Sequence, residues 1–187
     1  MYTSIIKKTA AYIHTYIFLM CLLSITFMSN SVSAEFLPGQ KQSFNDGWLF
    51  HKGEAKGSEN VEFDDSLWQP VTIPHDWAIE GPFEPKFNAR NGGLPFHGDG
   101  WYRKTFKVAK SDQGKFVSVT FDGAMYDAHV YINGHFLGRR PFGYVAVNYD
   151  LTPHLNFGDK ENVIAVSLSP KDLSTRWYPG AGLYRHT

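Results

Sequence analysis

Hydrophobic and polar side chains alternate with a period of two along most of the chain after residue 44. The run FVSVTFD, residues 116–122, puts Val117, Val119 and Phe121 on one face. Because successive side chains of a β-strand point to opposite faces, this alternation predicts strands that bury one face. After residue 44, no stretch of 11 or more residues has the period of an amphipathic helix. We expect strands at 48–52, 69–73, 101–108, 116–122, 126–133, 135–138, 146–151 and 163–168, with single helical turns at 111–114 and 151–155.

The clearest local signal is a hairpin between two of these strands. The run YDAHVYIN, residues 126–133, turns Ala128, Val130 and Ile132 inward, and the extended run HFLG starts at residue 135. Asn133 and Gly134 lie between them. Both residue types tolerate the positive φ that a type I′ turn requires, so this dipeptide predicts a tight antiparallel hairpin.

About eight short antiparallel strands in roughly 140 residues are typical of two packed sheets. We therefore predict an all-β fold, a jelly-roll or galactose-binding-like β-sandwich. The long interval 74–100 is rich in Gly, Pro, Asn and aromatic residues. A loop of this length inside a compact domain is usually functional or disordered. The interval contains four large aromatic residues, Trp77, Phe83, Phe87 and Phe96. Because such rings are not left in water, we expect an ordered loop that lies over a surface or a partner.

The first 34 residues have the composition of a secretory signal rather than of the fold. Lys7 and Lys8 precede a mostly apolar run, and Val32 and Ala34 occupy the small-residue positions of a cleavage site. This order predicts a cleavable signal helix at 1–34, cleaved after Ala34, and a periplasmic or secreted domain at 35–187. The alternative is an uncleaved anchor helix, because the apolar run is nearly long enough to span a bilayer.

Charge and cysteine content narrow the class of partner. Cleavage after Ala34 would remove Lys7, Lys8 and the single cysteine. It would leave 16 of the 18 basic residues against 18 acidic ones. A near-neutral exported domain without a basic stripe is a poor ligand for nucleic acid. Its core must also hold without disulfides. A neutral molecule is therefore the expected partner, and self-association is left open.

Candidate catalytic and metal-binding groups are dispersed. Glycoside hydrolysis needs two carboxylates flanking the scissile bond, and Glu80 and Glu84, the close pair of glutamates in the long loop, are interpreted as solvated. The histidines lack metal-binding spacing, so no metal and no cofactor are expected. In the dipeptide Asp76-Trp77 we expect Asp76 to bond local backbone and Trp77 to fill the core.

The remaining candidates suit the recognition of a sugar. Trp and Tyr offer flat faces with a polar edge, Arg offers fixed donors, and Asn and Asp complete hydrogen bonds to hydroxyl groups. The alternative is that the rings are core or interface aromatics and that the arginine pairs with a surface carboxylate. The candidate sugar-binding residues are Asn88, Asn91, Asp99, Arg176, Trp177 and Tyr178.

Five ordered blocks carry a resemblance to a known family. They are FNDGWLFHKG, FDDSLWQPVTIPHDW, GWYRKTF, the run from FDGAMYDAHV to VNYDLTPHL, and RWYPGAGLYR. Together they span residues 44–187 and resemble the N-terminal sugar-binding domain of glycoside hydrolase family 2, with the bacterial β-galactosidases most similar.

The resemblance implies a jelly-roll domain followed by an immunoglobulin-like sandwich and a TIM barrel. The barrel carries both catalytic glutamates of a retaining mechanism. The family's acid/base follows an asparagine, whereas this sequence has no Asn-Glu dipeptide and is too short for a barrel of about 250 residues. We therefore expect a fragment, a truncated gene product or the leading domain alone, inactive by itself, with the C-terminal domains of the same polypeptide as its partner.

In the family, two segments of this domain reach the sugar on one side of the cleaved bond. By position, 88–91 and 176–178 take this role, although some relatives have aspartate where this chain has Arg176. The segment RWYPGAGLYR is expected to turn at Pro179-Gly180 and to start a final strand at Leu183 that Thr187 cuts short. The implied ligand is a galactoside or another β-linked oligosaccharide. Two alternatives are an autonomous carbohydrate-binding module and a structural sandwich without a sugar role.

Overall fold

The computed structural model describes residues 39–81, 98–170 and 180–187, and the predicted signal segment 1–34 lies outside them. The chain divides into two units, 1–41 and 42–187, and everything below concerns the second unit. Within the described residues it contains eight strands and three 3-10 turns. They are β1 (Trp48–Lys52), β2 (Gln69–Val71), η1 (Trp77–Glu80), β3 (Gly100–Lys107), η3 (Lys110–Asp112), β4 (Ser118–Phe121), β5 (Ala128–Ile132), β6 (His135–Arg140), β7 (Val147–Asp150), η4 (Thr152–His154) and β8 (Glu161–Leu168).

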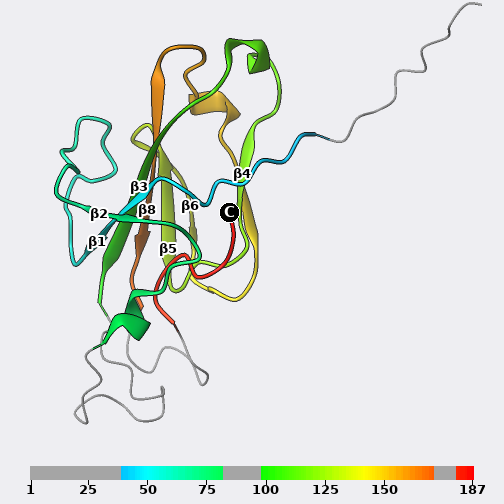
Figure 1. Cartoon of the computed structure of the whole chain (residues 1–187). Coiled ribbons are helices and arrows are strands. Elements are labelled where there is room, and N and C mark those ends of the chain that lie inside the picture. The colour runs from blue at the N-terminus through cyan, green and yellow to red at the C-terminus, as the bar shows by residue number, and fades with distance from the viewer. Residues whose placement is uncertain (1–38, 82–97, 171–179) are drawn as a thin grey trace, which may run out of the picture. The chain divides into compact units, whose positions relative to one another are not determined.

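The strands form two antiparallel sheets (Figure 1). The larger sheet has the order β2-β1-β3-β8-β5-β6, and β4 pairs with β7 in the smaller one. The longest ladder joins β3 to β8, from Gly100 opposite Leu168 to Lys107 opposite Glu161. This ladder at the centre of the large sheet sets the register of the strands on both sides of it.

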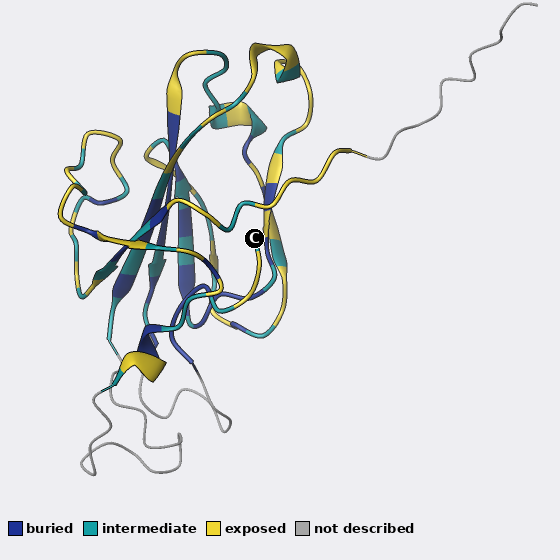
Figure 2. Cartoon of the chain, in the orientation of Figure 1, coloured by how far each residue is buried: buried dark blue, intermediate teal, exposed yellow. Residues whose placement is uncertain are grey.

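The core lies between the two sheets, where the inward-facing residues of each strand meet (Figure 2). Trp48 of β1 packs against Tyr102 of β3 and against Phe121 of β4, with ring centroids 6.4 and 6.3 Å apart. The predicted inward residues Ala128, Val130 and Ile132 are all buried. Aromatic and β-branched side chains therefore bridge the sheets, as the alternating pattern predicts.

The hairpin prediction is confirmed. β5 and β6 pair antiparallel, and Asn133 and Gly134 have φ values of 49° and 80°. The Asn133 carboxamide also bonds His154 O and Asn162 Oδ1, at 2.7 and 2.9 Å, which ties the turn to the start of β8. Each of the eight expected segments contains a strand, although the observed bounds differ from the predicted ones by a few residues in most cases.

The predicted final strand starting at Leu183 is not formed. Gly182 makes a single antiparallel bridge to Met125, and no strand follows it within residues 183–187. The backbone of Gly182 has φ 144°, and a Cβ atom there would lie 2.2 Å from the carbonyl oxygen of His75. The backbone at Gly182 therefore lies close to both His75 and Tyr102. Ala181 bonds Trp77, Gly182 bonds Met125 and Leu183 bonds His75, so these residues do not pair with a single strand.

The first and last described parts of this unit are joined by hydrogen bonds. Phe44 N donates to Thr187 O at 2.9 Å, and Thr187 N donates to Asn45 Oδ1 at 2.9 Å. Asn45 Nδ2 lies 2.9 Å from the ring nitrogen of His186. Segments more than 140 positions apart in the sequence therefore lie side by side.

Over residues 39–81, 98–170 and 180–187, we find no helix with the length and apolar content needed to cross a membrane.

Candidate functional site

Most of the predicted sugar contacts fall on two segments outside the described residues. Asn88 and Asn91 lie in 82–97, and Arg176, Trp177 and Tyr178 lie in 171–179. Asp99 is the member of the predicted set that the structure describes. The candidate site is therefore built here from the described residues at the four points where these two segments begin and end.

All four points lie at one end of the large sheet (Figure 1). Gly100, which follows the first segment, pairs with Leu168, which precedes the second. Trp77 N, ahead of the first segment, donates to Ala181 O, just after the second, at 2.9 Å. Both segments thus leave and re-enter the domain at neighbouring positions, although they are about 80 residues apart in the sequence.

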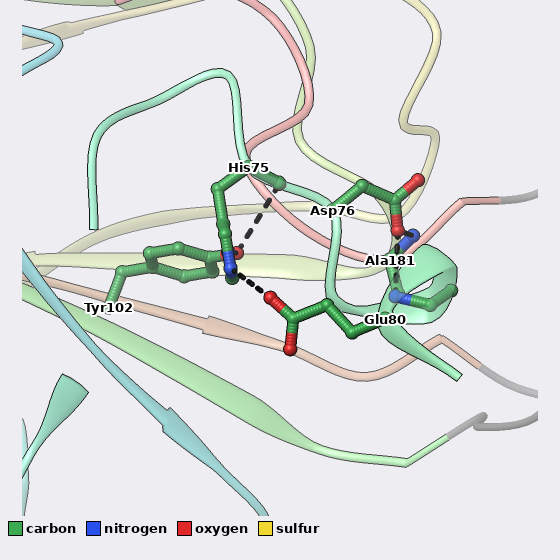
Figure 3. A network of polar contacts seen from close by, with 6 residues as sticks. His75, Asp76, Glu80, Tyr102 and Ala181 are labelled. Carbon is green, nitrogen blue, oxygen red and sulfur yellow. Dashed lines mark hydrogen bonds and ion pairs between the residues drawn. The ribbon is translucent and has the colours of Figure 1, made fainter. Parts of the chain in front are cut away.

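The residues that join these four points, His75, Asp76, Tyr102 and Ala181, are called the frame below. The carboxylate of Asp76 connects the two sides of the frame (Figure 3). Its Oδ1 accepts hydrogen bonds from Ala78 N at 2.9 Å and from Ala181 N at 2.8 Å. The first bond caps η1, as Asp commonly does at a helix N-cap. The predicted local role of Asp76 is confirmed, and the bond to Ala181 adds a link across 105 residues.

Beside Asp76, the His75 ring bonds two side chains (Figure 3). His75 Nδ1 lies 2.6 Å from Tyr102 Oη, and Nε2 lies 3.1 Å from Glu80 Oε1. A neutral ring that accepts from the Tyr102 hydroxyl at Nδ1 and donates from Nε2 to the Glu80 carboxylate satisfies both contacts. Glu80, interpreted from sequence as a solvated carboxylate, is half-exposed and also bonds His75.

Burial controls the ionisation of Tyr102. Because the phenolate form would have to be desolvated in the core, the pKa of Tyr102 is raised well above its usual value of 10. The phenol therefore keeps its proton further into alkaline pH than an exposed tyrosine, and its hydroxyl can donate a hydrogen bond to His75.

Trp77 fills the core under the frame, as predicted from sequence. Its side chain is fully buried and stacks on Phe50, with ring centroids 5.1 Å apart and planes 25° apart. Gly100 passes directly over this indole, since a Cβ atom at residue 100 would lie 2.6 Å from Trp77 Cη2. The first residue of β3, which follows the segment 82–97, is thus packed on Trp77, which precedes that segment.

Asp99 lies at the edge of the frame and faces the outer side of the large sheet. Its Oδ1 accepts a hydrogen bond from Ser169 Oγ at 2.5 Å, and its backbone oxygen accepts from Gly53 N at 2.7 Å. Asp99 and Ser169 also line an open pocket together with residues of β3, β5 and β8. The role of Asp99 as a sugar contact stays a prediction, and the sequence analysis named none of the other residues that line this pocket.

The described groups of the frame are engaged in holding backbone and aromatic rings. Within the described ranges, no three His, Cys, Asp or Glu side chains are grouped so that they could hold a metal ion. What this arrangement does is fix where the two adjoining segments begin and end.

Replacing Asp76 tests whether this frame depends on its carboxylate. Asp76→Ala removes the acceptor for two backbone donors, and we expect it to lower the free energy of unfolding by about 2–4 kcal/mol in urea titrations. Asp76→Asn keeps an oxygen at Oδ1 and should cost less. As a control, Asp64→Ala removes an exposed carboxylate that bonds Ser66 N and should cost much less. Equal losses for Asp64→Ala and Asp76→Ala would contradict this role.

The raised pKa of Tyr102 predicts a loss of stability in alkali. The unfolded chain releases this proton near pH 10 while the folded chain retains it, so the contribution is complete below pH 10 and declines as pH rises further. The decline for one proton is about 1.4 kcal/mol per pH unit. Urea unfolding of Tyr102→Phe should give a curve that is flatter above pH 10 than that of the unmodified chain. An unchanged slope would show that Tyr102 ionises normally in the fold.

Comparison with known proteins shows which family the chain belongs to. Residues 60–185 match the family described as glycosyl hydrolases family 2, sugar binding domain. BoGH2A, a β-galactosidase of Bacteroides ovatus, is 44% identical over 152 residues, which cover 80% of this chain and 18% of that protein. A putative β-glucuronidase of Formosa agariphila is 37% identical over 144 residues, which cover 76% of this chain and 14% of that protein.

Solved structures agree in fold. A β-glycosidase from Bacteroides vulgatus has a TM-score of 0.73 at 43% identity and covers 79% of this chain and 20% of its own. A β-glucuronidase from Bacteroides uniformis has a TM-score of 0.68 at 31% identity, with 79% and 17% covered. The chain thus spans a fifth or less of these relatives, and the predicted all-β fold and family resemblance are confirmed. The chain belongs to glycoside hydrolase family 2 and corresponds to its sugar-binding domain.

Proposed function

We propose that this domain completes the sugar-binding pocket of an exported β-galactosidase whose catalytic glutamates lie elsewhere in the same polypeptide. The observation that carries the proposal is that both candidate sugar-binding segments are anchored at one end of the sheet. Two segments that begin and end at neighbouring positions can contribute side chains to one common ligand. The 44% identity to a β-galactosidase favours a β-galactoside as substrate.

In this proposal the side chains of the two segments orient the sugar. The carboxamides of Asn88 and Asn91 and the guanidinium of Arg176 bond hydroxyl groups, and Trp177 and Tyr178 contact apolar faces of the ring. Asp99, which accepts a hydrogen bond from Ser169, lies beside the ends of both segments and is the predicted contact nearest to the sheet. The frame of Asp76, His75 and Tyr102 reduces the entropy lost on binding, because it fixes the segment ends before the sugar arrives.

A β-glucuronidase is the second candidate, because proteins with that name occur among the relatives at 37% and 36% identity. Arg90 and Arg176 belong to the two candidate segments, and an arginine can pair with the carboxylate of a glucuronide. The two candidates differ in the charge of the sugar, so a substrate panel separates them.

The test uses the polypeptide encoded by the complete gene, assayed on aryl β-galactoside, β-glucuronide and β-mannoside. We expect turnover of the β-galactoside, with kcat/KM at least about tenfold lower in Asn91→Ala and in Arg176→Ala, since each removes a substrate hydrogen bond. Lys115→Ala is the control, because this exposed lysine follows the opposite end of β3. Turnover by the 187-residue chain alone, or preference for the glucuronide, would contradict the proposal.

We also propose export, on the basis of the signal-like composition of residues 1–34. The gene product expressed in a bacterial host should be recovered from the periplasm or medium, and its N-terminal sequence should begin at Glu35. A mature protein that begins at Met1 and sediments with membranes would favour the anchor helix instead.

A further inference from the structure

The outer face of the large sheet carries a row of polar and aromatic side chains that are not part of the frame. Strand register places His51, Trp101, Ser167 and His129 in one row across β1, β3, β8 and β5. These side chains alternate with the buried core residues, so they point away from the smaller sheet. They are half-buried rather than fully exposed.

One part of this outer face is covered by the connection between β1 and β2. Arg103 lies on the outer face and is 2% exposed. Its guanidinium donates to Asp65 Oδ2 at 2.7 Å, to Asn60 O at 2.9 Å and to Ser58 O. Arg103 therefore holds the segment 53–68 against the sheet, and the start of this segment becomes a wall for the part of the face left open.

The open part is a pocket of about 410 Å³. This volume is within the range of small-molecule sites. Its lining combines the β1–β2 connection, the sheet and the frame: Glu54, Ala55, Lys56, Asp99, Trp101, His129, Tyr131, Ser167 and Ser169.

Two flat rings dominate the pocket. The rings of Trp101 and Tyr131 have centroids 6.2 Å apart and planes 26° apart. On this face the central strand β8 contributes only the small side chains of Ala165 and Ser167 between them, and both rings are half-buried. Phe136 of β6 packs at 5.3 Å from Tyr131 and extends the aromatic surface. Rigid rings on central strands present apolar area at little entropic cost.

The same pocket offers hydrogen-bonding groups without partners among the described residues. They are the indole N–H of Trp101, the hydroxyls of Tyr131 and Ser167, and the ring nitrogens of His129. Ser169 occupies one oxygen of the Asp99 carboxylate and leaves Oδ2 to accept. Flat apolar area edged by hydroxyl, indole and carboxylate groups matches a sugar ring, which has C–H faces and a rim of hydroxyls.

The charges select against an acidic sugar. Asp99 and Glu54 line the pocket with Lys56 as its single lysine, so an added carboxylate would meet a net negative lining.

We propose that this outer pocket binds a neutral oligosaccharide, at a place separate from the segments 82–97 and 171–179. Asp99 and Ser169 line the pocket and border those segments, so a glycan held in one site can continue into the other. The assignment of that glycan as substrate rests on the proposed function, whereas binding itself does not. The preferred ligand class is a chain of neutral hexoses rather than a single small glycoside.

Binding is tested on the 187-residue chain by calorimetric titration with β-1,4-galactotetraose and cellotetraose, and with tetragalacturonate as the acidic counterpart. We expect a neutral tetrasaccharide to bind and tetragalacturonate not to bind. Trp101→Ala should weaken binding about tenfold, since a ring contact is lost. Phe116→Ala is the matched control, because it removes an aromatic residue that is 70% exposed and outside the pocket, and it should leave affinity unchanged.

A second variant guards against misfolding of Trp101→Ala. Ser167→Val adds volume to the pocket floor with a residue that suits a strand, so it should fold and still weaken binding. The proposal would be overturned if neither neutral tetrasaccharide bound, or if the affinity were unchanged in both Trp101→Ala and Ser167→Val. So would affinity lost with Trp177→Ala but retained in Trp101→Ala. Failure of the complete gene product to hydrolyse glycosides would instead refute the proposed function and leave this titration as it stands.

Discussion

One carboxylate oxygen accepts hydrogen bonds from two backbone N–H groups, and the end of the large sheet that carries the candidate site depends on this interaction. Asp76 Oδ1 bonds Ala78, which leads into one segment, and Ala181, which follows the other. Each buried N–H would otherwise lose its hydrogen bond to water, which costs more than a typical hydrogen bond contributes. Without this bridge, the two segments would begin and end at independent positions. Trp77 and Gly100 pack directly beneath and fix the spacing.

The two polar sites of the domain are built in different ways. The frame around His75 and Tyr102 is internal, and its polar groups bond one another or the backbone. The outer pocket is the reverse, since its rings are positioned by strand register while most of its polar atoms face solvent. Enclosed groups contribute to stability and exposed groups remain available to a ligand. Asp99 belongs to both regions, since it lies at the edge of the frame and lines the pocket.

The strands could be predicted because one face of each is buried, which imposes a period of two on Val119, Phe121 and Val130. The turn at Asn133 could be predicted because few residue types adopt positive φ. The strand expected at Leu183 failed because Gly182 must pass beside the His75 carbonyl, a tertiary contact that local sequence does not encode. The reach of Asp76 to Ala181 was missed for the same reason. Trp101 and Tyr131 did give a signal, since both occupy outward positions of their strands where polar residues are expected.

The hydrogen bonds between residues 44–45 and 186–187 have a mechanical consequence. A pull applied through residues 44 and 187 would load these bonds before the β3–β8 ladder, because they join the two points at which the force enters. The ends would separate first and the sheets would stay paired. The outer pocket would keep its geometry, because β3, β8 and β5 stay paired. The frame would be the next part to open, because Ala181 and Leu183, which bond Asp76 and His75, lie in the stretch that is pulled.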